Sequence, residues 1–337
     1  MVLLGGLEEF EENIKMIESE ARLSAIFREW GRADFDEVRE FLETEPLAKK
    51  YLTPDRRFAD ELILAALIGY GETDPANAWE IFLTTQNYTN QRPLILNPAY
   101  RPYAHNVAAE EIMRSYFKIS GKEALNALRE IDPEYRLVFA PGLRAILSES
   151  NDAGFRSKLL KEFLDSSYLG RRTDAGIVCA GEAEHDPKSA WDTLQVWART
   201  QSMIGGDDPE MHFGIDMVQN WSRRQPIEAL RFVADLGEGE EQFYFSEGIM
   251  STQLQYRPEL VVEILEIESL KKVQEVIRPE QIVESLDYDI PWPLIEENVP
   301  LPREERLARL KQAVEASSFS KSLKDRFLAE IDAAKSK

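Results

Sequence analysis

The chain has 337 residues, of which 43% are hydrophobic, so it can bury a core and is too apolar to be disordered. Lys and Arg number 40 while Asp and Glu number 61, which gives a net charge of −21. A field of that sign repels phosphate backbones and anionic lipid headgroups, so nucleic acids and membrane surfaces are disfavoured as partners. The acidic excess either keeps the chain soluble or attracts a basic protein partner.

The first 30 residues predict a capping helix. Apolar or small residues alternate there at spacings of three and four, at Leu7, Phe10, Ile14, Ile17, Ala21 and Ser24. The pattern covers about two and a half heptads, whereas sustained coiled coils show at least three or four. We therefore expect an initial helix that covers the first repeat, and a short coiled coil is the alternative.

The N-terminus and the hydropathy bear on where the protein resides. The opening "MVLLGG" is too short for the apolar core of a signal peptide, and acidic residues follow it at once. No run of 18 apolar residues occurs, so the sequence predicts no membrane-spanning helix. We expect a cytoplasmic protein, and a periplasmic or secreted one is the alternative if a leader precedes this sequence.

One phrase recurs in residues 31–286: an aromatic residue, a polar break, a proline-like helix start and then apolar residues at helical spacing. The helix starts are Phe35, Pro75, Gly121, Pro187, Pro226 and Pro258, which we call the landmarks. A degenerate copy near Ala153 divides the long gap between Gly121 and Pro187. Proline suits the first turn of a helix and disfavours helix in the residue before it. Each landmark is therefore predicted to begin the second helix of a pair.

Apolar residues occupy most positions three, four, six and seven residues after each landmark, and this spacing makes one stripe of a helix. A large ring also recurs five residues before four landmarks, at Trp30, Tyr70, Tyr116 and Trp221. We expect these rings in the core between helices, because periodic rings usually pack there. Helix pairs at this period predict an all-α fold, an α-solenoid of six or seven stacked helix hairpins with terminal caps.

The phrases "W-x4-P-x2-AL" and "DP-x2-AW" resemble those of bacterial helical-repeat proteins described as HEAT-like or TPR-like. The resemblance covers roughly residues 30 to 265, and its motifs are short. It departs from the TPR pattern of a 34-residue period with fixed Gly, Tyr and Ala positions. The resemblance implies a right-handed superhelix and protein binding, with no catalytic residue to carry over.

Residues 81–109 contain no acidic residue, although acids are abundant elsewhere in the chain. The segment supplies the candidate partner-binding residues Tyr88, Arg92, Tyr100, Arg101, Tyr103 and His105. Its three prolines, at positions 93, 98 and 102, preclude a continuous helix. Insertions in solenoids map to one face, often the binding face, and Tyr and Arg are enriched in binding hot spots. The alternative is a loop whose rings merely pack on the adjacent hairpin.

The sequence carries no motif of a known catalytic class: no P-loop, G-x-G-x-x-G, H-E-x-x-H or G-x-S-x-G pattern occurs. Cys179 is the single cysteine and is expected as a small core residue. Acidic clusters around His185 and His212 suit helix N-termini, and metal binding there is the alternative. We expect a non-enzymatic interaction scaffold without cofactor or metal. The alternative is a helical toroid enzyme with a carboxylate active site acting on a polysaccharide.

The C-terminal part predicts a break and then a cap. Residues 287–302 carry four prolines around Trp292 and interrupt the helices. Residues 303–337 predict two amphipathic helices that form a capping hairpin. Residues 301–337 hold nine basic and six acidic side chains, so this part reverses the charge of the rest. The alternative to a cap is that this reversal docks the C-terminal part on the acidic body or on a second copy.

Overall fold

The computed structural model describes residues 20–44, 56–91, 101–131, 136–164, 172–201, 209–236, 245–246, 249–250, 257–267, 279–285 and 303–335. Every regular element within these ranges is an α-helix, so the predicted all-α class is confirmed. The described residues up to Asn151 form one compact unit and those from Asp152 onward form another. We describe each unit by itself.

Two of the predicted segments are only partly covered by these ranges. The predicted N-terminal cap, residues 1–30, is described from Glu20 onward, where it is helical. The predicted proline-rich break at 287–302 lies outside the described residues. In the part of the chain that the structure covers, no helix has both the length and the apolar character needed to cross a bilayer.

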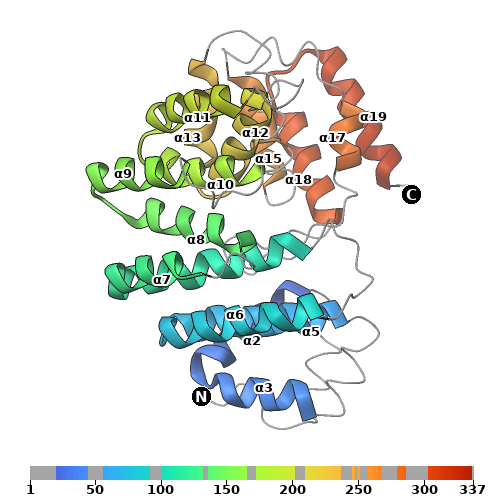
Figure 1. The fold of residues 1–337 in the computed structure, drawn as a ribbon. Coiled ribbons are helices and arrows are strands. Elements are labelled where there is room, and N and C mark those ends of the chain that lie inside the picture. Colours follow the sequence, from blue (N-terminus) through green and yellow to red (C-terminus); the bar gives the residue numbers. More distant parts are fainter. Residues whose placement is uncertain are drawn as a thin grey trace. The chain divides into compact units, whose positions relative to one another are not determined.

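Unit 1 is a succession of packed helices (Figure 1). They are α2 (Glu20–Ala33), α3 (Phe35–Thr44), α5 (Arg56–Gly71), α6 (Pro75–Gln91), α7 (Arg101–Arg129) and α8 (Arg136–Glu149). Helix α5 packs against α2, α6 and α7, and α7 packs in turn against α6 and α8. Helix α7 is kinked at Ser120, whose φ of −146° and ψ of 66° are not helical.

Unit 2 contains the remaining described helices. They are α9 (Ala153–Leu164), α10 (Arg172–Ala183), α11 (Pro187–Gln201), α12 (Pro209–Ser222), α13 (Pro226–Asp235), α15 (Pro258–Glu266), α17 (Pro279–Ser285), α18 (Arg303–Ala316) and α19 (Lys321–Lys335). Helix α10 packs against α9, α11 and α12, and α13 packs against α11 and α12. At the C-terminal end, α18 packs against α15 and α19, and α19 packs against α17.

All six landmarks begin a helix or a helical segment, as predicted. Helices α3, α6, α11, α13 and α15 start at their landmark residues. Gly121 directly follows the kink at Ser120 and so begins the second segment of α7. A helix also begins at the position of the degenerate copy, because α9 starts at Ala153.

An aspartate caps the helix start in four of these places. The side-chain oxygens of Asp34, Asp74, Asp152 and Asp186 each accept a backbone N–H three residues ahead, at 2.9–3.3 Å. An N-cap of this kind satisfies one of the N–H groups that a helix start leaves without a partner. Capping explains Asp186, a member of the first acidic cluster that the sequence singles out.

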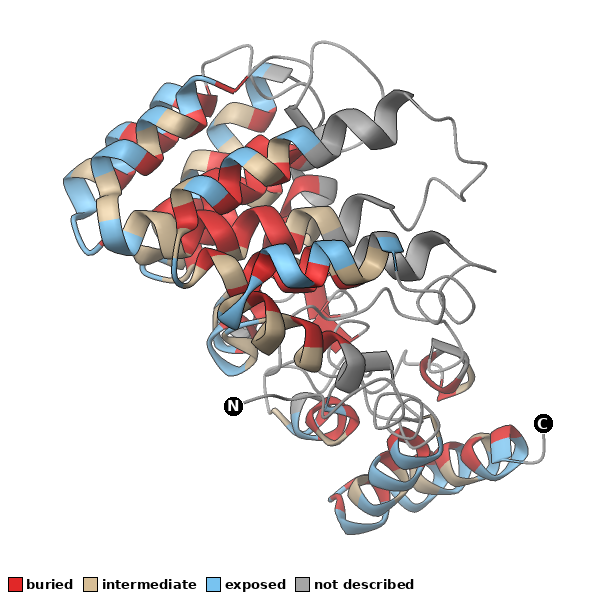
Figure 2. Cartoon of the chain, turned by 90° about the horizontal axis from the view of Figure 1, so that it is seen from below, coloured by how far each residue is buried: buried red, intermediate tan, exposed pale blue. Residues whose placement is uncertain are grey.

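The core follows the repeat register. The residues three positions after the six landmarks are fully buried: Val38, Ala78, Ala124, Ala190, Ala229 and Val261. Small side chains at this position let the next helix approach closely. Figure 2 shows the outcome, since most described helices carry a buried stripe on one side and exposed residues on the other.

The recurring rings are only partly core residues, which corrects the prediction. Trp221 is buried, whereas Trp30, Tyr70 and Tyr116 are half-buried. Each of three rings keeps a polar atom for the turn that follows it. Trp30 donates its indole N–H to Glu37, Tyr70 donates its hydroxyl to Asp74, and Trp221 donates its indole N–H to Gln225. These three rings therefore bond to the segment that follows them, and they also pack on neighbouring rings: Trp30 on Phe41, Tyr70 on Phe35 and Trp221 on Phe232.

Helices α2 and α5 cross at two glycines. A Cβ atom at Gly31 would collide with the backbone carbonyl of Ala66, and one at Gly69 would collide with that of Arg28. Backbone therefore meets backbone at this crossing. Nearby, Arg28 donates two hydrogen bonds to one oxygen of Glu72, at 3.0 Å and 2.7 Å, and so ties α2 to the end of α5.

The predicted C-terminal hairpin is present in unit 2 as α18 and α19. Its buried side chains include Leu307, Leu310, Val314, Leu323, Phe327 and Ile331. Two of its basic residues face acids of neighbouring helices. Arg309 Nη1 lies 3.9 Å from Glu259 Oε1 on α15, and Arg326 Nη2 lies 3.7 Å from Glu280 Oε2 on α17. In both contacts, a basic residue of the hairpin therefore pairs with an acid of the same unit.

Candidate functional site

The candidate partner-binding residues come mainly from two helix ends, not from one long loop. Helix α6 continues to Gln91 and therefore includes Tyr88. Helix α7 begins at Arg101 and includes Tyr103 and His105 in its first turns. Pro102 lies in that first turn, which tolerates proline. Arg92 and Tyr100 lie outside the described residues.

Packing between α6 and α7 brings these two ends together. The rings of Phe82 on α6 and His105 on α7 lie 6.4 Å apart, centroid to centroid, with an interplanar angle of 45°. Tyr88 lies six residues beyond Phe82, and Arg101 lies four residues before His105. We call this end of the α6–α7 pair, residues 84–91 and 101–105, the contact end.

The aromatic base of the contact end contains a buried donor. Trp79 is 2% exposed and stacks on Phe82 with ring centroids 5.5 Å apart. In the described structure its indole N–H has no hydrogen-bond acceptor. A buried donor without an acceptor lowers the free energy of unfolding, and the packing of the ring must offset that loss.

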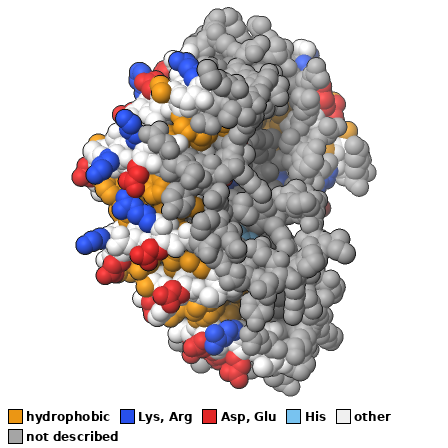
Figure 3. Space-filling model, in the orientation of Figure 1, with side chains coloured by type: hydrophobic (Ala, Val, Ile, Leu, Met, Phe, Trp, Pro, Cys, Tyr) orange, Lys and Arg blue, Asp and Glu red, His pale blue; other side chains and the backbone are white. Residues whose placement is uncertain are grey.

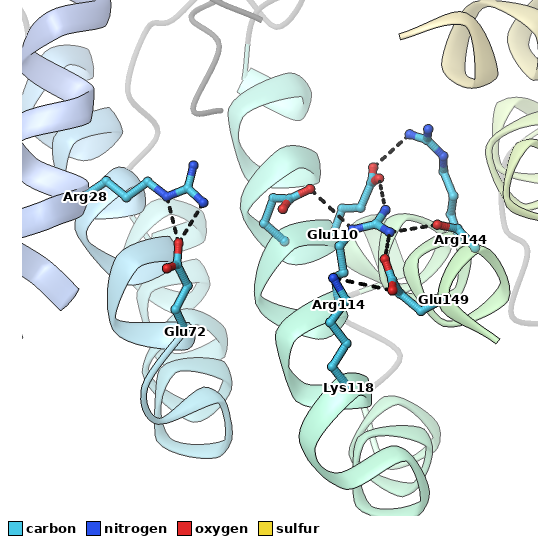
Figure 4. Close-up of polar contacts among 9 residues, drawn as sticks. Arg28, Glu72, Glu110, Arg114, Lys118, Arg144 and Glu149 are labelled. Atoms are coloured by element: carbon cyan, nitrogen blue, oxygen red, sulfur yellow. Dashed lines mark hydrogen bonds and ion pairs between the residues drawn. The ribbon is translucent and has the colours of Figure 1, made fainter. Parts of the chain in front are cut away.

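A charge network joins α7 to α8 next to this end (Figure 4). Arg144 Nη1 donates to Glu110 Oε2 at 2.8 Å, and Arg114 Nη2 donates to Glu110 Oε1, also at 2.8 Å. Arg114 Nη1 contacts Glu149 Oε1, and the second oxygen of Glu149 lies 3.4 Å from Lys118 Nζ. Charges of alternating sign therefore form a chain of five residues.

Arg114 makes two further contacts. Its Nη1 donates to the hydroxyl of Ser148 at 2.7 Å, and its Nε lies 3.5 Å from a carboxylate oxygen of Glu111. Arg114 thus reaches acids on its own helix and both an acid and a hydroxyl on α8. A guanidinium presents its donors in a rigid planar fork, so these contacts fix direction as well as distance.

The network runs from the interior of unit 1 to its surface. Arg144, Arg114 and Glu110 are buried, Glu149 is partly exposed, and Lys118 is exposed. Burial acts to raise the pKa of Glu149, but its hydrogen bond to Arg114 and the charges of Arg114 and Lys118 outweigh this and lower that pKa. Glu149 is therefore ionised wherever the network is intact at neutral pH.

Unit 2 contains a smaller buried ion pair between α9 and α10. Arg156 Nε donates to Glu182 Oε2 at 2.8 Å, and the two residues are 6% and 4% exposed. Burial raises the pKa of Glu182 in spite of the favourable contact with Arg156. Arg156 stands three residues after the degenerate landmark, where other hairpins have Ala or Val. Glu182 stands five residues before Pro187, where four other landmarks have a ring.

Cys179 lies on α10 near this pair and is fully buried, which confirms it as a core residue. Burial raises the pKa of its thiol, and the charge of Glu182 adds to that effect. A thiol in such a place stays protonated and is a poor nucleophile. Among the described residues no three His, Cys, Asp or Glu side chains are grouped as metal ligands are.

The sequence pattern does not predict the charge network. One signal is visible afterwards: Arg144 interrupts the apolar run from Val138 to Leu147, and a lone arginine in a buried helix needs a partner. The match to Glu110 depends on which helix packs against α8, and local patterns do not contain that information.

The comparisons with known proteins add no relative. No family model, no curated protein and no solved structure matches this chain.

Proposed function

We propose that this chain is a non-enzymatic protein-interaction scaffold, built as a right-handed α-solenoid of six or seven hairpins in the manner of HEAT-like and TPR-like proteins. The repeat register carries the proposal. Six landmarks begin helical segments, and the residues three positions later are buried at every landmark. Each hairpin of such a protein buries its apolar face against its neighbours, and the stack presents an extended surface.

Packing between alternate helices supports the proposal. In unit 1 the first helices of successive pairs follow one another, because α2 packs against α5 and α5 packs against α7. In unit 2, α10 packs against α12 and α11 packs against α13. When hairpins stack in register, the first helix of each pair packs on the first helix of the next, and the second helix packs on the second.

We place the partner at the contact end. This end lies in a stretch without acids and carries Tyr88, Arg101, Tyr103 and His105, residue types that are enriched in binding hot spots. The partner is a protein, and the net charge of −21 suits a basic one, which the acids elsewhere on the chain would attract. On the face in Figure 3 the described acids and bases are interspersed, which suits protein contacts better than a phosphate backbone.

Small-angle scattering tests the architecture. A compact domain of this length has a radius of gyration of about 20 Å. A solenoid of stacked hairpins is longer in one direction, so we expect a clearly larger value and an asymmetric distance distribution. A radius near that of a compact domain would contradict the solenoid.

Affinity capture followed by mass spectrometry tests the contact end. Once a partner is identified, Arg101→Ala with Tyr103→Ala should weaken its binding roughly thirtyfold, since a hot-spot residue contributes about 2 kcal/mol. Melting temperature should hardly change. Arg231→Ala, which removes an exposed arginine of α13, is the control and should bind normally. Unchanged binding by the double variant would rule out this end as the contact.

A further inference from the structure

We propose that the charge network of α7 and α8 is a positioning device, which holds the contact end of α7 in a single orientation for its partner; this inference rests on the proposed function of that end. The network residues on α7, Glu110 and Arg114, lie five and nine residues beyond His105. They belong to the same straight segment as the contact residues, because α7 is interrupted only later, at Ser120.

The kink in α7 explains why the first segment needs contacts of its own to fix its orientation. The second segment of α7, from Gly121 onward, is separated from the first by a residue with non-helical backbone angles. The orientation of the first segment must therefore be set by its own contacts. Its polar contacts to α8 include those of the buried Glu110 and Arg114, which meet Arg144, Ser148 and Glu149, and the exposed ion pair of Lys118 with Glu149.

Buried ion pairs and hydrogen bonds such as those of the α7–α8 network fix the relative orientation of two helices more than they stabilise the fold. Apolar side chains pack in several registers at similar free energy, whereas the guanidinium fork of Arg114, with polar partners on two helices, is satisfied in one. Buried ion networks are also often no more stabilising than apolar residues of equal volume, because desolvation offsets their attraction. What the network supplies is one register between α7 and α8, and thus one direction for the first turns of α7.

Hydrogen exchange followed by mass spectrometry tests this without any partner. The variant combines Glu110→Leu, Arg114→Met and Arg144→Met in the full chain, which replaces the buried charges together. We expect a melting temperature within a few degrees of the wild type. Amides of residues 101–109 should nevertheless exchange on the order of tenfold faster, while those of α10 to α13 stay unchanged. Arg129→Met, an exposed change on the same helix, is the control and should alter neither.

A network with only a structural role predicts something else. In that case a variant that keeps its melting temperature also keeps the exchange of residues 101–109, and this result would overturn the proposal. If the triple variant does not fold, Glu149→Gln with Lys118→Met weakens the network from its exposed end. Exchange of residues 101–109 should then rise several-fold, and unchanged exchange would again overturn it. Failure of the proposed function would instead appear as normal partner capture by Arg101→Ala with Tyr103→Ala.

Discussion

The two units bury charge between neighbouring helices in different ways. In unit 1 the α7–α8 network spreads over several residues and reaches the surface at Lys118. In unit 2 the α9–α10 pair joins two buried residues, Arg156 and Glu182, at repeat positions that elsewhere hold a small apolar residue and a ring. The comparison shows that the charges of the first are shared among several partners on two helices, whereas Arg156 and Glu182 stand at two positions where most other landmarks have apolar or aromatic residues.

Breaking the α9–α10 pair should have the largest effect. Arg156→Met leaves the Glu182 carboxylate buried without its cation, which should lower the free energy of unfolding by about 3–5 kcal/mol at neutral pH. Denaturant titration measures the loss. Lys158→Met, an exposed change on the same helix, is the matched control and should cost little. A loss below about 1 kcal/mol would show that Glu182 does not depend on Arg156.

Restoring the repeat residues should reverse most of that loss. Arg156→Ala combined with Glu182→Tyr gives α9 and α10 the residues that other hairpins carry at these positions. We expect stability within about 1 kcal/mol of the wild type, because apolar replacement of a buried pair is often neutral. The matched change in unit 1, Glu110→Leu with Arg114→Met, removes the carboxylate that Arg144 Nη1 contacts and should cost more than the unit 2 double variant. If the unit 2 double variant is as unstable as Arg156→Met, the pair is not a replacement of this kind.

The pH dependence of the two acids should have opposite signs. The pKa of Glu149 is lowered, so its contribution to stability is present above the unfolded value near 4.5 and is lost as pH falls through the folded value. The pKa of Glu182 is raised, so its contribution is present below 4.5 and is lost as pH rises through the folded value. Denaturant titrations of Glu149→Gln and Glu182→Gln against the wild type across this range measure both trends. Parallel trends would contradict the assignment.

The exposed end of the network should matter least. Lys118 is exposed, and Glu149 keeps Arg114 as a partner without it. Lys118→Met should therefore change the free energy of unfolding by less than about 0.5 kcal/mol. A loss above about 1 kcal/mol would mean that the network depends on its surface member.

Helix starts could be predicted from the sequence because their causes are local. An aspartate such as Asp74 caps the helix that Pro75 begins, and both effects act within one turn. At Ala153 the spacing of the landmarks points to a helix start, and the structure adds the local cause, since Asp152 is the cap. The positions of these helix starts can therefore be predicted without knowing how the helices pack.

The candidate site could be predicted only in part. Composition draws attention to residues 81–109, but it does not show that α6 extends to Gln91 or that His105 meets Phe82. The charge network escapes altogether, because Glu110 and Arg144 are 34 residues apart. Only the packing of α7 on α8 makes them neighbours, and that packing rests on long-range contacts.

The glycine crossing of α2 and α5 affects how the chain can change during evolution. Every amino-acid substitution at Gly31 or Gly69 adds a side chain, and a Cβ at either position meets backbone, which cannot rotate away. At Gly154 a Cβ would meet only a side-chain oxygen of Asp152. We therefore expect substitutions at Gly31 and Gly69 to be accepted far more rarely than at Gly154. Another helix of the chain could take the place of α2 only if it had a glycine at the position of Gly31.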